Sequence, residues 1–298
     1  MPFSCTEKAF AKINLNLEVI GRRPDGYHEL VSLVAFAHDL FDVVTLRRAD
    51  CLSVNISGVS AHNIDGKNLI LSAAEQAAEL PFIIYTGHIE LVKTLPVAAG
   101  LGGGSSDAAA TLRAIGRLNN VVDFETAFSG LCPKLGADVP VCLQSETAQG
   151  AFMWGIGEHV WRPEPSSDPI LPCGLSAVLA NPRLPVATGD IFRALAAKPL
   201  ENPELRLFEP QTFKNSDELF HFLKGSRNDL ERPACSVLPV IKDVLSALAA
   251  LPHCRLARMS GSGATCFALF ENFSQAEAAA SELTAEEPGW WVAKTRLS

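Results

Sequence analysis

The sequence of 298 residues has few charged and few aromatic residues, 19% and 7%, whereas apolar residues make up 48%. The low charge content excludes a generally disordered chain and leaves ample side chains for packed cores. No run approaches the roughly 18 uncharged apolar residues of a membrane helix, so no membrane partner is expected. Residues 1–23 carry Glu7, Lys8 and Lys12 where a secretory signal needs its apolar segment, so we expect a cytoplasmic protein.

The eight cysteines form no C-x-x-C pair and show no histidine spacing typical of a zinc site. The sequence therefore predicts reduced, mostly buried thiols rather than a disulfide scaffold. A net charge of −8 and a pI near 5.4 argue against nucleic acid as a partner. An anionic small molecule stays open as a ligand, because a local pocket can be positive on an acidic protein.

The hydrophobic pattern predicts an α+β protein. Residues 9–20 alternate with period two, which indicates a strand whose polar face, including Lys12 and Asn14, meets water or a pocket. Further strands are expected at 30–37, 41–46, 52–56, 87–95, 175–180, 255–259, 265–270 and 290–294. Helical spacing predicts helices at 68–80, 108–119, 124–135, 190–197, 212–223, 237–250 and 274–283.

A proline-rich stretch at residues 162–174 is the best candidate for a boundary loop. It predicts two domains, at residues 1–162 and 163–298. The sequence contains no internal repeat.

The most informative segment is a glycine-rich loop between a predicted strand and a predicted helix. Its residues are Pro96, Val97, Ala98, Ala99, Gly100, Leu101, Gly102, Gly103, Gly104, Ser105 and Ser106. Glycines let the backbone approach an anion closely, and the free N–H groups and dipole of a helix start favour phosphate. Either serine is expected to cap the helix or to face phosphate or Mg²⁺.

A loop that needs glycine only for its conformation is the plainer alternative. A Walker A motif is excluded because Asn68 follows the only Gly-Lys pair. A Rossmann motif is excluded because the chain is helical where its acidic residue should lie. A protein kinase is excluded because H-R-D and D-F-G are absent.

Three motifs together resemble the GHMP kinase superfamily. They are Ala11-Lys12-Ile13-Asn14-Leu15, the glycine-rich loop, and Met259-Ser260-Gly261-Ser262-Gly263-Ala264. The resemblance implies an N-terminal domain like domain 2 of ribosomal protein S5 and a C-terminal ferredoxin-like domain. It also implies ATP as the phosphoryl donor and Mg²⁺ as its metal, with Gly261, Ser262 and Gly263 in a supporting role.

Three further segments resemble the family of 4-diphosphocytidyl-2-C-methyl-D-erythritol kinases within this superfamily. They are Gly21 to Leu30 (GRRPDGYHEL), Leu135 to Pro140 (LGADVP) and Arg227 to Glu231 (RNDLE). The resemblance implies phosphorylation of the 2-hydroxyl of the cytidine-diphosphate-linked methylerythritol, in the non-mevalonate route to isoprenoid precursors. Asp107 departs from the expected Asn, which leaves Ser105, Ser106 and Asp107 open as metal ligands.

The resemblance assigns the general base to Asp138 and its cationic partner to Lys12. Phosphoryl transfer to an alcohol needs a proton acceptor and neutralisation of phosphate charge, which this pair supplies. Taken alone, Asp138 would be a helix cap or turn former and Lys12 a solvated strand residue.

For the acceptor substrate the resemblance implies contacts from Asn14, Tyr27, His28, Thr188 and Phe192. Tyr27 and His28 would contact the cytosine, and Phe192 would cover the other face of its ring. Without the resemblance, Tyr27 would pack over the Pro24-Asp25-Gly26 turn and His28 would bond a backbone carbonyl. On the adenine side the implied residues are Asn68 and Lys93.

Two alternatives remain: another GHMP kinase, such as homoserine or mevalonate kinase, and a non-catalytic ligand sensor on the same fold. The Tyr27-His28 pair argues against the first, because a substrate without cytosine has no use for it. Retention of Lys12 and Asp138 argues against the second. The sequence leaves a monomer or a homodimer open.

Overall fold

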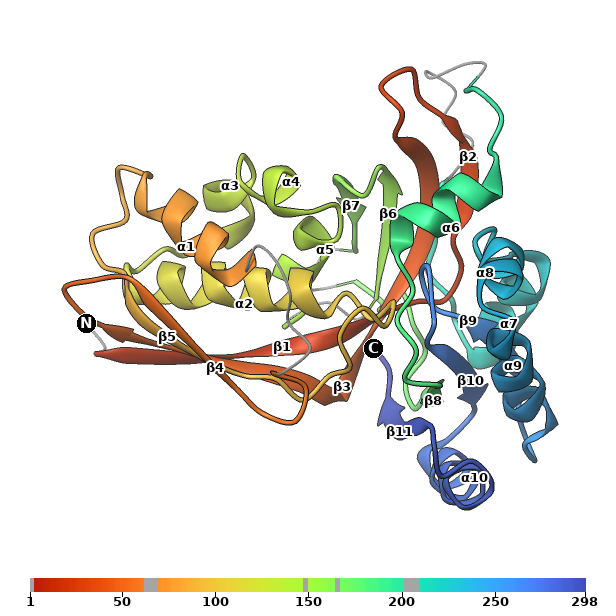
Figure 1. Cartoon of the computed structure of the whole chain (residues 1–298). Coiled ribbons are helices and arrows are strands. Elements are labelled where there is room, and N and C mark those ends of the chain that lie inside the picture. Colours follow the sequence, from red (N-terminus) through yellow and green to blue (C-terminus); the bar gives the residue numbers. More distant parts are fainter. Residues whose placement is uncertain (1–2, 62–68, 147–149, 164–166, 201–208) are drawn as a thin grey trace. The chain divides into compact units, whose positions relative to one another are not determined.

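The computed structural model describes residues 3–61, 69–146, 150–163, 167–200 and 209–298. The chain forms two compact units (Figure 1). Unit 1 comprises residues 1–12, 40–97 and 102–147, and unit 2 comprises residues 13–39, 98–101 and 148–298. They interleave in sequence because β1 (Ser4–Asn14), β3 (His28–Arg48) and the glycine-rich loop contribute to both. The domains expected at residues 1–162 and 163–298 stay a prediction.

In unit 1, helices cover one face of a small sheet (Figure 1). The second half of β3 pairs antiparallel with β5 (Gly87–Val92), and β4 (Ser53–Ser57) pairs parallel with β5. α1 (Leu69–Ala78) packs against α2 (Gly103–Leu118), whose small alanine side chains let it lie close to its neighbours. Three short helices follow: α3 (Phe124–Phe128), α4 (Cys132–Leu135) and α5 (Val139–Leu143).

In unit 2, the first half of β3 pairs antiparallel with β2 (Glu18–Arg22) and with β6 (Ala151–Gly155), which pairs with β7 (His159–Trp161). A second, antiparallel sheet has the order β11-β8-β10-β9. Its strands are β8 (Ser176–Asn181), β9 (Leu256–Met259), β10 (Cys266–Phe270) and β11 (Trp291–Arg296).

The helices of unit 2 are α6 (Thr188–Leu195), α7 (Ser216–Gly225), α8 (Glu231–Val237), α9 (Val240–Ala250) and α10 (Phe273–Glu286). Ile241 and Leu248 of α9 and Leu283 of α10 are fully buried with Val178 and Phe270 of the second sheet. Numbered along the chain, the sheet order is 4-1-3-2, with helices α6 to α9 between its first and second strands and α10 between its third and fourth. This is the ferredoxin-like arrangement, so the expected α+β class is confirmed.

Several expected boundaries were wrong because side chains and sheet pairing override local pattern. The strand expected over 9–20 stops at Asn14, since the Asn16 side-chain oxygen accepts from the Leu33 N–H (2.6 Å) and the Leu17 N–H donates to the Arg227 carbonyl (2.9 Å). The two strands expected at 30–37 and 41–46 form one strand, β3.

One expected helix is divided in the structure and another is shorter than expected. The helix expected at 124–135 becomes α3 and α4, and that at 237–250 begins only after Pro239, the N-cap residue of α9. Strands β6 and β7 and helix α5 were not expected.

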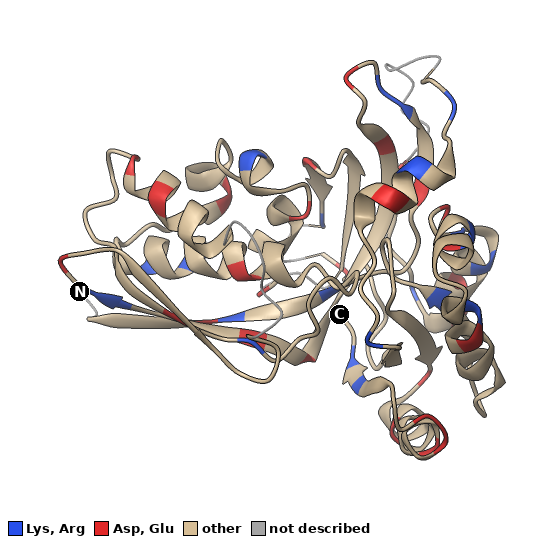
Figure 2. Ribbon diagram, viewed as in Figure 1, with Lys and Arg blue, Asp and Glu red and all other residues tan. Residues whose placement is uncertain are grey.

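Charges on the described surface are paired locally rather than gathered by sign. Figure 2 shows acidic residues on α10 and basic residues on β11, and the Lys294 ammonium pairs with the Glu277 carboxylate. In unit 1, Arg47 Nη2 lies 3.3 Å from Glu90 Oε2. In the described part of the chain, no helix is both long and apolar enough to cross a membrane.

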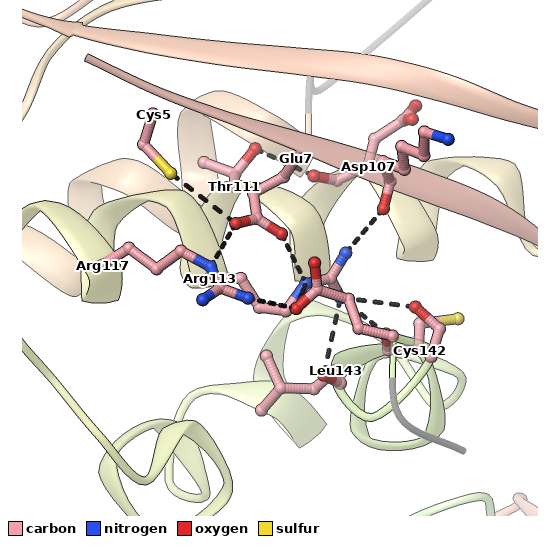
Figure 3. A network of polar contacts seen from close by, with 11 residues as sticks. Cys5, Glu7, Asp107, Thr111, Arg113, Arg117, Cys142 and Leu143 are labelled. Atoms are coloured by element: carbon pink, nitrogen blue, oxygen red, sulfur yellow. Dashed lines mark hydrogen bonds and ion pairs between the residues drawn. The ribbon is translucent and has the colours of Figure 1, made fainter.

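A buried guanidinium joins β1, α2 and α5 within unit 1 (Figure 3). Arg113 is 1% exposed and donates to the Cys142 carbonyl (2.9 Å), the Lys8 carbonyl (2.7 Å) and Glu7 Oε2 (3.1 Å). Arg117 Nε approaches the other oxygen of Glu7 at 2.5 Å. Burial, together with a hydrogen bond to Glu146, raises the pKa of Glu7. The cluster fixes the strand that carries Lys12 to the helix that begins at the glycine-rich loop.

Arg113→Met is expected to lower the free energy of unfolding by about 3–5 kcal/mol, because it leaves the Glu7 carboxylate and two buried carbonyls without this donor. Arg47→Met, which removes one partner of the exposed Arg47–Glu90 pair, should cost no more than about 1 kcal/mol. Urea unfolding of both variants at pH 7 measures the difference. Equal losses in the two variants would contradict the anchoring role of Arg113.

Candidate active site

The glycine-rich loop leads into α2 through a left-handed residue. Gly102 is the N-cap of α2 with φ 64°, and its carbonyl accepts the first helical bond, from the Ser106 N–H at 2.8 Å. The N–H groups of residues 103–105 lie in the first turn, where a helix provides no carbonyl partner. These amides and the helix dipole favour an anion at this end of α2.

The serines do not cap α2, contrary to expectation, because Gly102 holds the N-cap position and both serines lie inside the helix. The Ser106 side chain is buried, and its hydroxyl contacts the Phe10 carbonyl (2.8 Å) and Cys142 Sγ (3.2 Å). It therefore fastens α2 to β1 rather than facing the loop. Ser105 Oγ lies beside Gly136, 3.5 Å from where a Cβ there would stand.

Lys12 and Asp138 form an ion pair beside Gly102. Lys12 Nζ lies 2.9 Å from Asp138 Oδ2, with side-chain exposures of 4% and 31%. Asp138 occupies the N-cap position of α5, yet its side chain makes no capping hydrogen bond. A Cβ at Gly102 would stand 3.0 Å from Lys12 Cε and 3.8 Å from Asp138 Oδ2. The start of α2, a buried ammonium and a partly exposed carboxylate thus meet within unit 1.

A second buried lysine is held by two carboxylates. Lys93 Nζ lies 2.6 Å from Asp42 Oδ2 and 2.5 Å from Asp107 Oδ2, and all three side chains are at most 5% exposed. Burial lowers the pKa of Lys93, but the carboxylates of Asp107 and Asp42 outweigh it and raise that pKa overall. Asp42 Oδ1 also accepts from the Thr94 and Leu95 N–H groups, at 2.5 and 2.9 Å. The ammonium of Lys93 is therefore engaged inside unit 1, although it lies 3.1 Å from a Cβ at Gly103.

In unit 2, the third motif packs against residues 98–101 of the loop. Ser260 Oγ donates to the Gly100 carbonyl (3.0 Å), and the Thr265 N–H donates to the Ala99 carbonyl (3.1 Å). A Cβ at Gly100 would stand 2.5 Å from the Ser260 carbonyl oxygen and 2.8 Å from that of Gly263. Only glycine fits this approach, and its φ of 73° agrees.

Asn14 is buried against the same motif. Its N–H donates to Ser260 Oγ (3.1 Å), its Nδ2 donates to Ser32 Oγ (2.8 Å), and its Oδ1 lies 3.2 Å from a Cβ at Gly261. Thr188, the first residue of α6, is held in turn by a hydrogen bond between Thr188 Oγ1 and Ser262 Oγ (2.8 Å). Three parts of the expected site thus lie together in unit 2: Asn14, Thr188 and the third motif.

His28 and Phe192 are in direct ring contact, with centroids 4.8 Å apart and an interplanar angle of 31°. This distance is that of touching rings, so no third ring fits between these two. Burial and the neighbouring Arg22 charge lower the pKa of His28, which is therefore neutral at pH 7. Tyr27 follows Gly26 (φ 93°) and is 60% exposed. An aromatic ligand has access to Tyr27 but not to the face of His28 that Phe192 covers. Asn68 lies outside the described residues.

The residues proposed for Mg²⁺ do not by themselves form a metal site. Ser106 faces the interior and Asp107 pairs with Lys93, which leaves Ser105 of the three. Among the described residues, no group of three His, Cys, Asp or Glu side chains is arranged to hold a metal ion. Mg²⁺ usually keeps several waters and binds substrate phosphates beside few protein ligands.

Sequence reasoning missed Asp42 and Asn228. The signal for Asp42 is a carboxylate within the mostly apolar run of residues 41–46, since a buried carboxylate must find partners. Asn228 lies in the Arg227–Glu231 segment, which matched the family but received no role.

Asp107→Asn should make folding less sensitive to pH. Burial raises the pKa of Asp107 to about 7, above its unfolded value of 3.8. Its contribution to stability is therefore fully present below the unfolded pKa and is lost as pH rises through about 7. From roughly pH 5 to 8 the variant should lose less free energy of unfolding than the wild type.

Urea unfolding across this range measures the two slopes, with Asp217→Asn, a substitution at an exposed position, as control. Parallel declines in wild type and Asp107→Asn would show that Asp107 does not titrate as its burial implies.

Comparisons with known proteins identify the family and the fold of this chain. The family profile of the GHMP kinases N terminal domain matches residues 68–146, and that of the GHMP kinases C terminal matches residues 202–289. A crystal structure of homoserine kinase from Cytophaga hutchinsonii has the same fold, with a TM-score of 0.68 at 18% identity over 100% of this chain and 96% of that one.

Closer similarity is found to 4-diphosphocytidyl-2-C-methyl-D-erythritol kinases. That of Rhodopseudomonas palustris (strain BisB5) is 46% identical over 98% of this chain and 99% of its own length, and that of Parvibaculum lavamentivorans is 46% identical over 96% of each. A crystal structure of 4-(cytidine 5'-diphospho)-2C-methyl-D-erythritol kinase matches with a TM-score of 0.68 and 33% identity over 99% of each chain. The chain therefore belongs to the 4-diphosphocytidyl-2-C-methyl-D-erythritol kinase family of GHMP kinases and is an ATP-dependent small-molecule kinase.

Proposed function

We propose that this kinase transfers the γ-phosphoryl group of ATP to the 2-hydroxyl of 4-diphosphocytidyl-2-C-methyl-D-erythritol. The observation that supports it most is the 2.9 Å pair of Lys12 and Asp138 beside the start of α2. The names of the similar proteins supply the substrate.

Asp138 acts as the general base in this proposal. Its carboxylate is 31% exposed and makes no capping bond, so an oxygen is available to an acceptor hydroxyl. The hydroxyl proton passes to the carboxylate as the alcohol oxygen bonds to the γ-phosphorus, and the bond from phosphorus to the bridging oxygen of ADP breaks. In a loose transition state the proton leaves late, so Asp138 mainly orients the hydroxyl and accepts its proton.

Lys12 and the first turn of α2 supply positive charge. The ammonium stabilises charge on the transferring group, and the first-turn amides of residues 103–105 favour bound phosphate. Mg²⁺ belongs to this proposal as a metal that arrives with ATP and neutralises phosphate charge. Ser105 is the remaining expected ligand, because Ser106 faces the interior and Asp107 pairs with Lys93.

Substrate recognition is proposed for Asn14, Tyr27, His28, Thr188 and Phe192. A neutral His28 both donates and accepts a hydrogen bond, as the edge of a cytosine requires. Since Phe192 already covers one face of His28, the base would stack on the exposed Tyr27 ring, unless Phe192 moves away.

The substrate assignment is tested by measuring ADP release with the cytidine-diphosphate-linked methylerythritol, homoserine and mevalonate as separate acceptors. Turnover is expected only with the first, because the other two lack the cytosine that Tyr27 and His28 would contact. Turnover with homoserine or mevalonate alone would overturn the assignment and leave the kinase family intact.

Asp138→Asn should lower kcat by about 10²–10⁴-fold, the usual effect of losing a general base. The matched control is Asp123→Asn, since Asp123 caps α3 through the Thr126 N–H and lies outside the proposed site. The control should keep normal turnover. Near-normal kcat in Asp138→Asn, at equal folded fraction, would remove Asp138 from the role of base.

A further inference from the structure

The side chain of Asn228 holds the turn of the third motif. It is 7% exposed, and its Nδ2 donates to the carbonyls of Met259 and Gly261, both at 2.8 Å. Its Oδ1 accepts from the Leu230 N–H at 2.9 Å. An amide group uses both its donors and its acceptor here, so its orientation is fixed.

The turn held by Asn228 carries two buried hydroxyl groups with partners in the proposed site. Ser260 Oγ accepts from the Asn14 N–H and donates to the Gly100 carbonyl, at 3.1 and 3.0 Å. Ser262 Oγ bonds to Thr188 Oγ1 at 2.8 Å. One turn thus touches the glycine-rich loop and two residues proposed to bind the acceptor, all within unit 2.

Neighbouring residues fix Asn228 itself. The Asp229 N–H donates to the Leu17 carbonyl (2.8 Å), and Asp229 Oδ2 accepts from the Val19 N–H (2.7 Å). Glu231 Oε2 accepts from the Met259 N–H at 2.9 Å. The Arg227–Glu231 segment, which resembles the family in sequence, therefore hydrogen-bonds both to residues 17–19 after β1 and to the third motif.

We propose that Asn228 is a positioning residue for phosphoryl transfer, which acts through the Met259–Gly261 turn and Ser260 to place Gly100 of the nucleotide loop. The assignment rests on the proposed function for its role in turnover, and on the family's ATP-binding loop for its role in nucleotide affinity. Asn228 makes no direct contact with the reacting groups in this proposal.

The substitution Asn228→Asp tests this proposal, because it leaves the volume of the side chain nearly unchanged. The substitution puts an acceptor oxygen opposite two carbonyl oxygens that now receive hydrogen bonds, so the turn should shift away from the loop. A misplacement of about 1 Å can cost about 100-fold in rate, so kcat/KM for ATP should fall by about 10- to 100-fold. The Kd for ADP, measured by calorimetry, should rise by about tenfold, or about 1.4 kcal/mol.

Asn272→Ala is the matched control, because Asn272 caps α10 through the Gln275 N–H and touches neither the turn nor the loop. It should lower the melting temperature and leave KM for ATP and the Kd for ADP unchanged. If Asn228→Asp fails to fold, Asn228→Ser keeps one donor and should show a smaller change in the same direction.

A double-mutant cycle tests whether Asn228 acts on the loop through Ser260. Ser260→Ala removes the donor to Gly100, so if Asn228 acts through Ser260 the double variant should be about as impaired as the worse single variant. Effects that multiply, or a folded Asn228→Asp protein with normal KM and Kd, would overturn the proposal. If the wild type binds ADP yet does not phosphorylate the cytidine-linked acceptor, the proposed function fails, while the ADP titrations still decide the role of Asn228.

Discussion

A lysine buried inside a protein keeps its charge only with a counter-charge beside it, and the ion pair of Lys12 and Asp138 satisfies this requirement. The pair constrains its surroundings. Glycine is favoured at position 102, because a Cβ there would stand only 3.0 Å from Lys12 Cε and because the residue is left-handed, with φ 64°. The ammonium and the first-turn amides, for which the helix provides no carbonyl partner, therefore lie near one carboxylate. A chain with a net charge of −8 thus contains a local group of positively charged and hydrogen-bond-donating groups.

In unit 2, close backbone contacts and hydrogen bonds, rather than an ion pair, fix the glycine-rich loop. Gly100 lies so close to the Ser260 and Gly263 carbonyls that any side chain would collide with them, and Ser260 fixes the Gly100 carbonyl. Hydrogen bonds of this kind are directional, so they define the position of the loop more narrowly than apolar packing does. The turn at 259–263 is in turn fixed by the side chains of Asn228 and Glu231. Asn228 and Glu231 thus fix the turn against which the glycine-rich loop packs.

Local pattern was sufficient to predict the strand–loop–helix arrangement around the glycines, the α+β class and most elements of the second sheet. Motif order was sufficient to predict the family. What local pattern did not predict depends on contacts distant in sequence. The hydroxyl of Ser106 faces the Phe10 carbonyl, 96 residues earlier, and the strand with Lys12 stops at Asn14 because Asn16 and Leu17 bond to residues 33 and 227. The whole fold determines which residues become such partners, so a short stretch of sequence does not reveal them.

Lys12 and Lys93 differ in the solvent exposure of the carboxylates that hold them. Both ammonium groups are buried to the same extent, and both lie near the start of α2. The carboxylates of Asp42 and Asp107 that hold Lys93 are closed off from solvent, so neither is accessible to a substrate. The carboxylate that holds Lys12 is open on one side. A base must reach its proton donor, which only Asp138 among these three carboxylates can do. Lysine and aspartate therefore stabilise the fold in the cluster around Lys93 and, we infer, take part in proton transfer at Lys12 and Asp138.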